Sequence, residues 1–246
     1  MIAALPATAS AQPSLRAEGT EFVLTTADGR TLKSADLQGA TLKIGSAGRE
    51  IEVTITSVEE DPRAVGGPVL LHHFAVKDRT GRAADLCEPD ASGRSLGFPV
   101  PDGHGGFELT CTSGAIGKCI RWGYRSWEEA PGGPPLRALH QACVHMARAD
   151  YGGDGRASKR DGTLIDMYDR FGIQTPRREV AMSFEAAWGV DGAICVARPR
   201  IPENASLEDL GERYPHLKAH LGPAALCTEE IAMHDPRALL FNRSRD

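Results

Sequence analysis

Six cysteines constrain the fold of this chain more than any other feature of its sequence. They form an even set whose closest members are separated by seven residues, at Cys87, Cys111, Cys119, Cys143, Cys195 and Cys227. Because no Cys-x-x-Cys pair is present, a zinc site built from short knuckles is disfavoured. An even set favours disulfides made in an oxidising compartment, and the alternative is a reduced cytosolic protein with buried thiols. Six cysteines allow fifteen connectivities, and the sequence does not choose among them.

The N-terminal segment has the pattern of the end of an export signal. Ala9-Ser10-Ala11 before Gln12 is a small-x-small cleavage motif, although the positive region that opens such signals is missing. We therefore predict that residues 1–19 are a signal-peptide remnant and a flexible leader, that the true start of the signal lies upstream of Met1, and that the protein is periplasmic or secreted. The alternative is a disordered alanine-rich end.

Composition and charge disfavour two classes of partner. The 246 residues include 28 Lys and Arg against 33 Asp and Glu, a net charge of −5, with no basic block that would make a nucleic-acid footprint. No apolar run approaches the ~18–20 residues that a membrane-spanning helix needs. We expect no nucleic acid and no membrane span, and the expected partner is an unidentified envelope or extracellular one.

Residues 20–86 are predicted to form a β-rich N-terminal region. Apolar residues recur at every second position in 51–55 and, with His72 included, in 70–76. This alternation is typical of an antiparallel sheet with one face in water. His72 and His73 point to opposite faces of such a strand, so they are interpreted as ordinary strand histidines and not as a metal-binding pair.

Residues 87–200 are predicted to be a second region, and 201–246 a C-terminal helical extension. Residues 88–106 are rich in Gly, Pro, Asp and Ser and form the best candidate boundary. A strand at 107–111 should lead into a helix capped by Thr112 or Ser113, with Cys119 facing inward. A second helix should begin at Pro135, bury Cys143 and end near Asp150 at a left-handed glycine.

Shorter patterns complete the predicted fold, which is α+β and held by disulfides. Residues 166–170 are expected to form a helical turn, and 184–188 with 194–196 a β-hairpin. Ser206-Leu207-Glu208-Asp209 is a capping box with Asp in place of Glu. The overall expectation is an antiparallel β-rich part packed on a region with two or more helices and a hairpin.

A group of aspartates in the second region is the strongest polar constellation. Calcium is the cation that their oxygens would suit, with candidates Asp150, Asp154, Asp166 and Asp169. Five basic residues lie in the same span, so salt bridges are the alternative to a cation cage. A general acid/base pair could join His140 or His145 to an aspartate. For a hydrolase-like site the candidates are His140, Asp150, Asp154 and Asp161.

Motifs that identify common enzyme classes are absent. The sequence has no Gly-x-Ser-x-Gly elbow, phosphate loop, His-Glu-x-x-His pair, dinucleotide fingerprint or EF-hand loop. No cofactor is therefore predicted. These absences weaken the usual enzyme assignments, but a dispersed site would leave no such signature.

Several longer motifs together resemble the ADYC-domain proteins of bacteria. They are Arg148-Ala149-Asp150-Tyr151-Gly152-Gly153-Asp154-Gly155, Thr112-Ser113-Gly114-Ala115-Ile116, Lys118-Cys119-Ile120-Arg121-Trp122-Gly123-Tyr124, Arg160-Asp161-Gly162-Thr163 and Phe184-Glu185-Ala186-Ala187-Trp188-Gly189. The resemblance covers about residues 85–200 and implies an exported protein of uncharacterised function. The family tetrad that ends in cysteine corresponds to Ala149-Asp150-Tyr151-Gly152 in this chain, so its last position is Gly here. This difference implies an unpaired partner thiol unless the chain has rearranged its disulfides.

Two hypotheses about function follow. The first is a non-catalytic envelope or secreted binding module. The second is a hydrolase-like enzyme that uses the His and Asp candidates of the second region. A pocket that gathers those side chains would favour the enzyme, and a salt-bridged surface would favour the module.

Overall fold

The structure, a computed structural model, divides the chain into two units. It describes residues 12–46, 49–78, 80–129, 132–177, 181–222 and 227–245. Unit 1 comprises Met1–Asp61 and Val69–Cys111, and unit 2 comprises Pro62–Pro68 and Thr112–Asp246. The boundary expected between residues 86 and 87 falls within unit 1, because the Gly- and Pro-rich stretch from 88 joins strands of the same sheet. The motif Ala9-Ser10-Ala11 lies outside the described residues.

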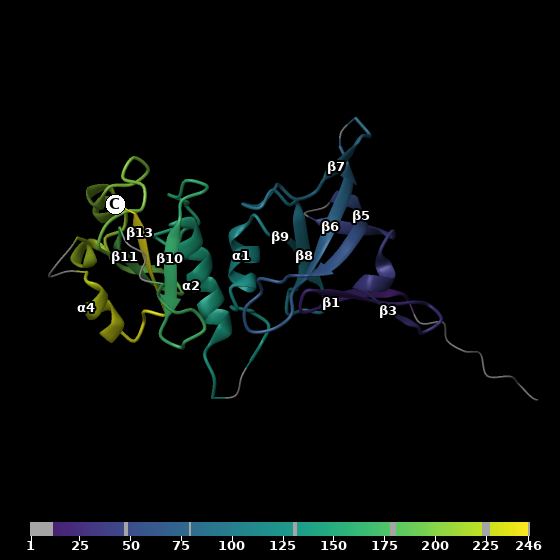
Figure 1. The fold of residues 1–246 in the computed structure, drawn as a ribbon, viewed down its shortest axis with the longest axis horizontal. Helices are drawn as coiled ribbons and strands as arrows, with labels where there is room; N and C mark the ends of the chain where they lie inside the picture. The colour runs from purple at the N-terminus through teal and green to yellow at the C-terminus, as the bar shows by residue number, and fades with distance from the viewer. Residues whose placement is uncertain are drawn as a thin grey trace, which may run out of the picture. The chain divides into compact units, whose positions relative to one another are not determined.

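Unit 1 consists of two antiparallel sheets. A three-stranded sheet has the order β1-β2-β3, and a six-stranded sheet has the order β4-β5-β6-β8-β9 with β7 paired to β6 (Figure 1). The strands are β1 (Ser14–Glu18), β2 (Glu21–Thr25), β3 (Thr31–Lys33), β4 (Thr41–Ser46), β5 (Arg49–Glu60), β6 (Leu70–Lys77), β7 (Ala83–Asp85), β8 (Leu96–Pro101) and β9 (Phe107–Cys111), with a 3-10 helix at Ser34–Leu37. β1 therefore lies in the segment that was expected to be a flexible leader.

The core of unit 1 follows the predicted alternation. Val53 and Ile55 are fully buried, whereas Ile51, at the start of the same pattern, is 38% exposed. Phe22 packs edge-on against the rings of Phe74 and His72. The antiparallel pairing of β5 with β4 and β6 confirms the predicted sheet, and its buried face is closed by apolar and aromatic side chains.

Unit 2 combines helices with a four-stranded antiparallel sheet. The sheet has the order β10-β13-β11-β12, so its second strand comes from the end of the chain. The elements are α1 (Ala115–Arg121), α2 (Leu136–Arg148), β10 (Ile165–Asp169), β11 (Met182–Gly189), β12 (Gly192–Val196), α3 (Leu207–Arg213), a 3-10 helix (Lys218–His220), α4 (Glu229–His234) and β13 (Leu240–Arg245). The described part of the segment expected to be a helical extension thus holds α3, the 3-10 helix, α4 and a strand inside the sheet.

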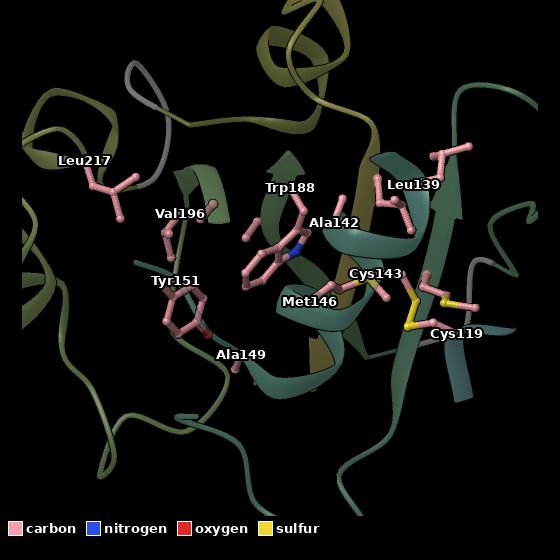
Figure 2. Packing of buried hydrophobic residues seen from close by; sticks show 14 of the residues in the cluster. Cys119, Leu139, Ala142, Cys143, Met146, Ala149, Tyr151, Trp188, Val196 and Leu217 are labelled. Atoms are coloured by element: carbon pink, nitrogen blue, oxygen red, sulfur yellow. A yellow bond between two sulfur atoms is a disulfide. The ribbon is translucent and has the colours of Figure 1, made fainter. Parts of the chain in front are cut away.

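Helix α2 supplies the centre of the unit 2 core. Its residues Leu139, Cys143 and Met146 are fully buried, as their helical spacing predicts, and α2 packs on β11, β12 and β13. Figure 2 shows Met146 beside the ring of Trp188, near Tyr151. The two rings are stacked with their centroids 5.3 Å apart. The predicted inward position of Cys143 is confirmed.

Three local predictions need correction. Residues 166–170 do not form a helical turn, because 165–169 pair with β13 as strand β10. Helix α1 begins after Gly114 without a side-chain cap, and not after a capping Thr112 or Ser113. The left-handed residue that ends α2 is Ala149, with φ 49°, and not a glycine. By contrast, the Ser206 and Asp209 capping box is confirmed.

The loop Pro62–Pro68 belongs to unit 2 because Arg125 binds its backbone. The guanidinium of Arg125 donates to the carbonyls of Val65 at 2.7 Å, Gly66 at 3.1 Å and Gly67 at 2.8 Å. The arginine is buried, so these bonds are shielded from water. Sequence periodicity carries no sign of this contact, since its partners are about sixty residues apart.

All six cysteines are paired. The disulfides are Cys87–Cys111 in unit 1 and Cys119–Cys143 and Cys195–Cys227 in unit 2. The bond between α1 and α2 is visible in Figure 2. No thiol is left over by the glycine at position 152, so the chain does not contain the unpaired partner that the tetrad suggested. None of the helices in the described ranges has the length and apolar character needed to cross a bilayer.

Candidate functional site

Asp150 is a buried carboxylate at the end of α2. Only 1% of the residue is exposed, and its Oδ2 accepts hydrogen bonds from His145 Nδ1 at 3.0 Å and from the backbone N–H of Gly155 at 2.9 Å. The second contact comes from the glycine-rich loop that follows the tetrad. Together these donors offset the unfavourable position of a carboxylate at the negative end of a helix.

His145 has both ring nitrogens committed to acceptors inside the chain. Nδ1 faces the Asp150 carboxylate, and Nε2 lies 3.1 Å from the backbone carbonyl of Val190 in the turn between β11 and β12. A histidine that acts as a general base needs one nitrogen open to the substrate. The pair of His145 and Asp150 therefore ties the end of α2 to the hairpin.

Asp154 and Tyr214 close the loop that follows the tetrad. The hydroxyl of Tyr214 donates to Asp154 Oδ2 at 3.0 Å, and the backbone N–H of Arg156 donates to the other carboxylate oxygen. The N–H of Arg156 is the main cause that holds the pKa of Asp154 below its usual range. The Tyr214 ring lies over Gly152, where an added Cβ would overlap the ring atoms. Position 152 thus has space only for glycine.

His140 and Asp161 form their contacts with residues outside this loop. His140 Nδ1 contacts the carbonyl of Tyr124 at 2.9 Å, and burial lowers the pKa of the ring. Asp161 is exposed and forms an ion pair with Lys159. Among the described residues, no hydrogen bond or ion pair joins any two of the four hydrolase candidates.

The remaining calcium candidates bind protein groups. Asp169 accepts from the Tyr124 hydroxyl at 2.8 Å and from the backbone N–H groups of Phe171, Ile173 and Gln174. Asp166 accepts from the backbone N–H of Arg177 and pairs with Arg243 at 3.4 Å. Within the described ranges, no three His, Cys, Asp or Glu side chains are grouped so that they could hold a metal ion.

A buried network that sequence patterns missed lies beneath the tetrad. Glu185 Oε2 accepts from Arg200 Nε at 2.9 Å and from Asn242 Nδ2 at 2.8 Å, and Glu185 Oε1 accepts from the Tyr151 hydroxyl at 3.2 Å. The same hydroxyl accepts from the backbone N–H of Arg200 at 2.8 Å. Burial raises the pKa of Tyr151 well above its usual value. The only sign of this network in the sequence is Glu185, a charged residue within the otherwise apolar segment 184–188.

Replacing Asp150 should destabilise unit 2. Asp150→Asn keeps the shape but removes the charge that both donors face, so we expect a loss of about 1–3 kcal/mol in the free energy of unfolding. Trp122, Trp127 and Trp188 all lie in unit 2, so their fluorescence during urea denaturation reports this unit. Asp161→Asn, at an exposed position, is the matched control. An unchanged midpoint for Asp150→Asn would contradict the structural assignment.

Gly152→Ala should also destabilise unit 2, because its methyl group must displace the Tyr214 ring. Overpacking of this kind typically costs ~1–3 kcal/mol. Urea denaturation of the single variant, of Tyr214→Ala and of the double variant forms a thermodynamic cycle. The penalty of Gly152→Ala should shrink in the Tyr214→Ala background. Equal penalties in both backgrounds would show that the ring is not the obstacle.

One comparison with known proteins agrees with the family that the motifs resemble. A family model described as the ADYC domain matches residues 34–202. No curated protein and no solved structure matched the chain. The matched range covers more than half of the 246 residues and includes α1, α2, the tetrad and the hairpin of β11 and β12. The chain therefore belongs to the ADYC-domain family.

Proposed function

We propose that this chain is an exported binding module, in which unit 2 is a rigid and non-catalytic scaffold. The observation that carries the proposal is the commitment of both His145 nitrogens to acceptors within the chain. His145, Asp150 and Asp154 are bonded so that they hold α2, the loop after the tetrad and the hairpin together. Three disulfides in a chain without a free thiol support a site of action in the periplasm or outside the cell.

Export predicts that the cysteines are oxidised in the native protein. Intact mass after denaturation and alkylation, with and without prior reduction, measures this. Protein recovered from the periplasm should take up alkyl groups on its cysteines only after reduction. Six thiols alkylated without reduction, in protein that was folded beforehand, would contradict both the disulfides and the proposed location.

The hydrolase alternative can be tested at two of its candidate residues, His140 and Asp154. Exported, oxidised protein is assayed with chromogenic ester, amide, glycoside and phosphoester substrates, beside His140→Gln and Asp154→Asn. Under the proposal, neither variant changes any turnover that the wild type shows. A turnover lost in both variants, while Trp fluorescence confirms their fold, would replace the binding module with an enzyme.

Partner contacts should be sought on exposed apolar side chains of unit 2. Arg170 donates to the carbonyls of Met233 and Asp235, which holds the loop after β10 beside α4. Phe171 is 40% exposed and Met233 is 45% exposed. A photo-crosslinking residue at position 171, compared in cells with one at exposed Asp161, should capture a discrete partner only at 171. Equal capture at the two positions would contradict this surface.

A further inference from the structure

Three polar side chains form a relay on the exposed face of the larger sheet in unit 1. The Thr56 hydroxyl on β5 is hydrogen-bonded to Nδ1 of His73 on β6. Nε2 of the same ring lies 2.9 Å from Oδ1 of Asp85 on β7. A hydroxyl, an imidazole and a carboxylate thus occur in the order that nucleophilic catalysis uses, and all three belong to one sheet.

The sheet places these residues for local reasons. His72 and His73 point to opposite faces, so the buried ring of His72 leaves His73 on the solvent side. The pairing of β5 with β6 skips from Ile55 to Ser57, so Thr56 is the extra residue of a β-bulge. Bulges re-aim side chains, and this one brings the hydroxyl to the ring of His73.

The contacts determine the direction of the hydrogen bonds. Asp85 is a carboxylate acceptor, so it favours the tautomer of His73 that carries hydrogen on Nε2. Nδ1 then carries the lone pair and accepts from the Thr56 hydroxyl. The backbone carbonyl of His73 is another acceptor for this hydroxyl, but its 3.3 Å distance is longer than the contact to Nδ1.

We propose that Thr56 is a nucleophile for acyl transfer from small, unhindered carboxylic esters. Thr56 Oγ1 attacks the ester carbonyl carbon while Nδ1 of His73 takes the hydroxyl proton. The bond to the leaving alcohol breaks, and that alcohol receives the proton from His73. Water then attacks the acyl-threonine with His73 as base, and the acid and the free hydroxyl are released. Asp85 is a positioning residue that orients the ring.

The relay is exposed, so a small substrate has direct access to the Thr56 hydroxyl. The side chains of His73 and Asp85 are 32% and 48% exposed, and Thr56 is also exposed. An ester can therefore reach the hydroxyl without any opening of the fold. All the groups belong to unit 1, so the proposal stands independently of the binding function assigned to unit 2.

Labelling with p-nitrophenyl acetate tests the proposal on the full chain. After an acid quench, peptide mass spectrometry locates the acetyl group. We expect an acetyl group on the hydroxyl of residue 56 in the wild type and in Thr56→Ser, and a labelling rate at least ~100-fold lower in His73→Gln, since a general base contributes ~10²–10⁴-fold. Thr54→Ala is the matched control, because Thr54 bonds to Thr41 on the same sheet without a histidine.

Each other result overturns the proposal. No acetyl group on Thr56, labels on lysines alone, or an acetyl group that stays on His73 would mean that the hydroxyl is not the nucleophile. A rate at Thr56 that His73→Gln leaves unchanged would mean that the contact is only a cross-strand hydrogen bond. Far-UV circular dichroism of each variant shows that the sheet is intact.

Discussion

Glu185→Gln should reduce the free energy of unfolding of unit 2 by about 3–5 kcal/mol. Glu185 is fully buried and pairs with Arg200, of which only 5% is exposed. The neutral amide leaves the guanidinium buried without a counter-charge, and breaking one side of such a pair is strongly destabilising. The N–H₂ of the new amide also faces the N–H₂ of Asn242 or the hydroxyl of Tyr151. Both of these groups donate to the carboxylate in the wild type.

Urea denaturation followed by tryptophan fluorescence measures this loss in unit 2. Trp188 is a sensitive probe, because its indole N–H donates to Asn242 in the same network. Glu203→Gln is the matched control, since Glu203 pairs with Arg160 at 3.5 Å on the surface and such pairs contribute ~0–1 kcal/mol. Replacing both charges, as in Glu185→Gln with Arg200→Met, should recover part of the loss. A single-variant loss below that of Glu203→Gln would refute the role of the network.

Unit 1 should lose about 3 kcal/mol of stability as the pH falls from 6.5 to 4. Burial lowers the pKa of His72 to about 4 from the ordinary 6.5, an effect that the backbone of Gly97 partly offsets. The ring is stacked on Phe74 and bonded to the hydroxyl of Ser34. Between these pH values His72 is protonated in the unfolded chain but neutral in the folded chain. The contribution of His72 to stability is therefore fully present above pH 6.5 and is lost as the pH falls toward 4.

Hydrogen exchange of peptides from β2 and β6 measures this change, because unit 1 contains no tryptophan. Protection is compared at pH 7 and pH 5 after correction for the intrinsic exchange rate. His72→Gln should lower protection at pH 7 but remove the part of the pH dependence that His72 causes. His104→Gln, at an exposed loop position, should retain the wild-type dependence. An identical pH dependence in wild type and His72→Gln would contradict the assignment.

The segment Ala149-Asp150-Tyr151-Gly152 has a structural explanation in the present chain. Ala149 makes the left-handed turn, Asp150 binds His145, Tyr151 reaches the buried ion pair and Gly152 leaves space for the ring of Tyr214. Through Gly155, Glu185 and Tyr214, the last three of these residues join the end of α2 to other segments of unit 2. Substitutions in the tetrad should therefore act first on stability, and any effect on binding should follow from it.

Local patterns in the sequence determined several elements correctly. The alternation in 51–55 and 70–76 predicted two strands, the spacing of Leu139 and Cys143 predicted a buried helix face, and Ser206 with Asp209 predicted a helix start. These features depend on neighbours two to four residues apart, whose relative geometry is set by the backbone itself. The even cysteine count likewise predicted that disulfides form, but not their pairing.

The tertiary structure alone decided which distant segments meet. It selected one cysteine pairing among fifteen, brought β13 from the end of the chain between β10 and β11, and placed His145 on Asp150 where the sequence also allowed His140. It also made 165–169 a strand where a helical turn was expected over 166–170, because the hydrogen bonds of β13 outweigh local preference. The physical reason is that contacts such as the ion pair between Glu185 and Arg200 form only when the whole chain folds. No local periodicity in the sequence can predict them.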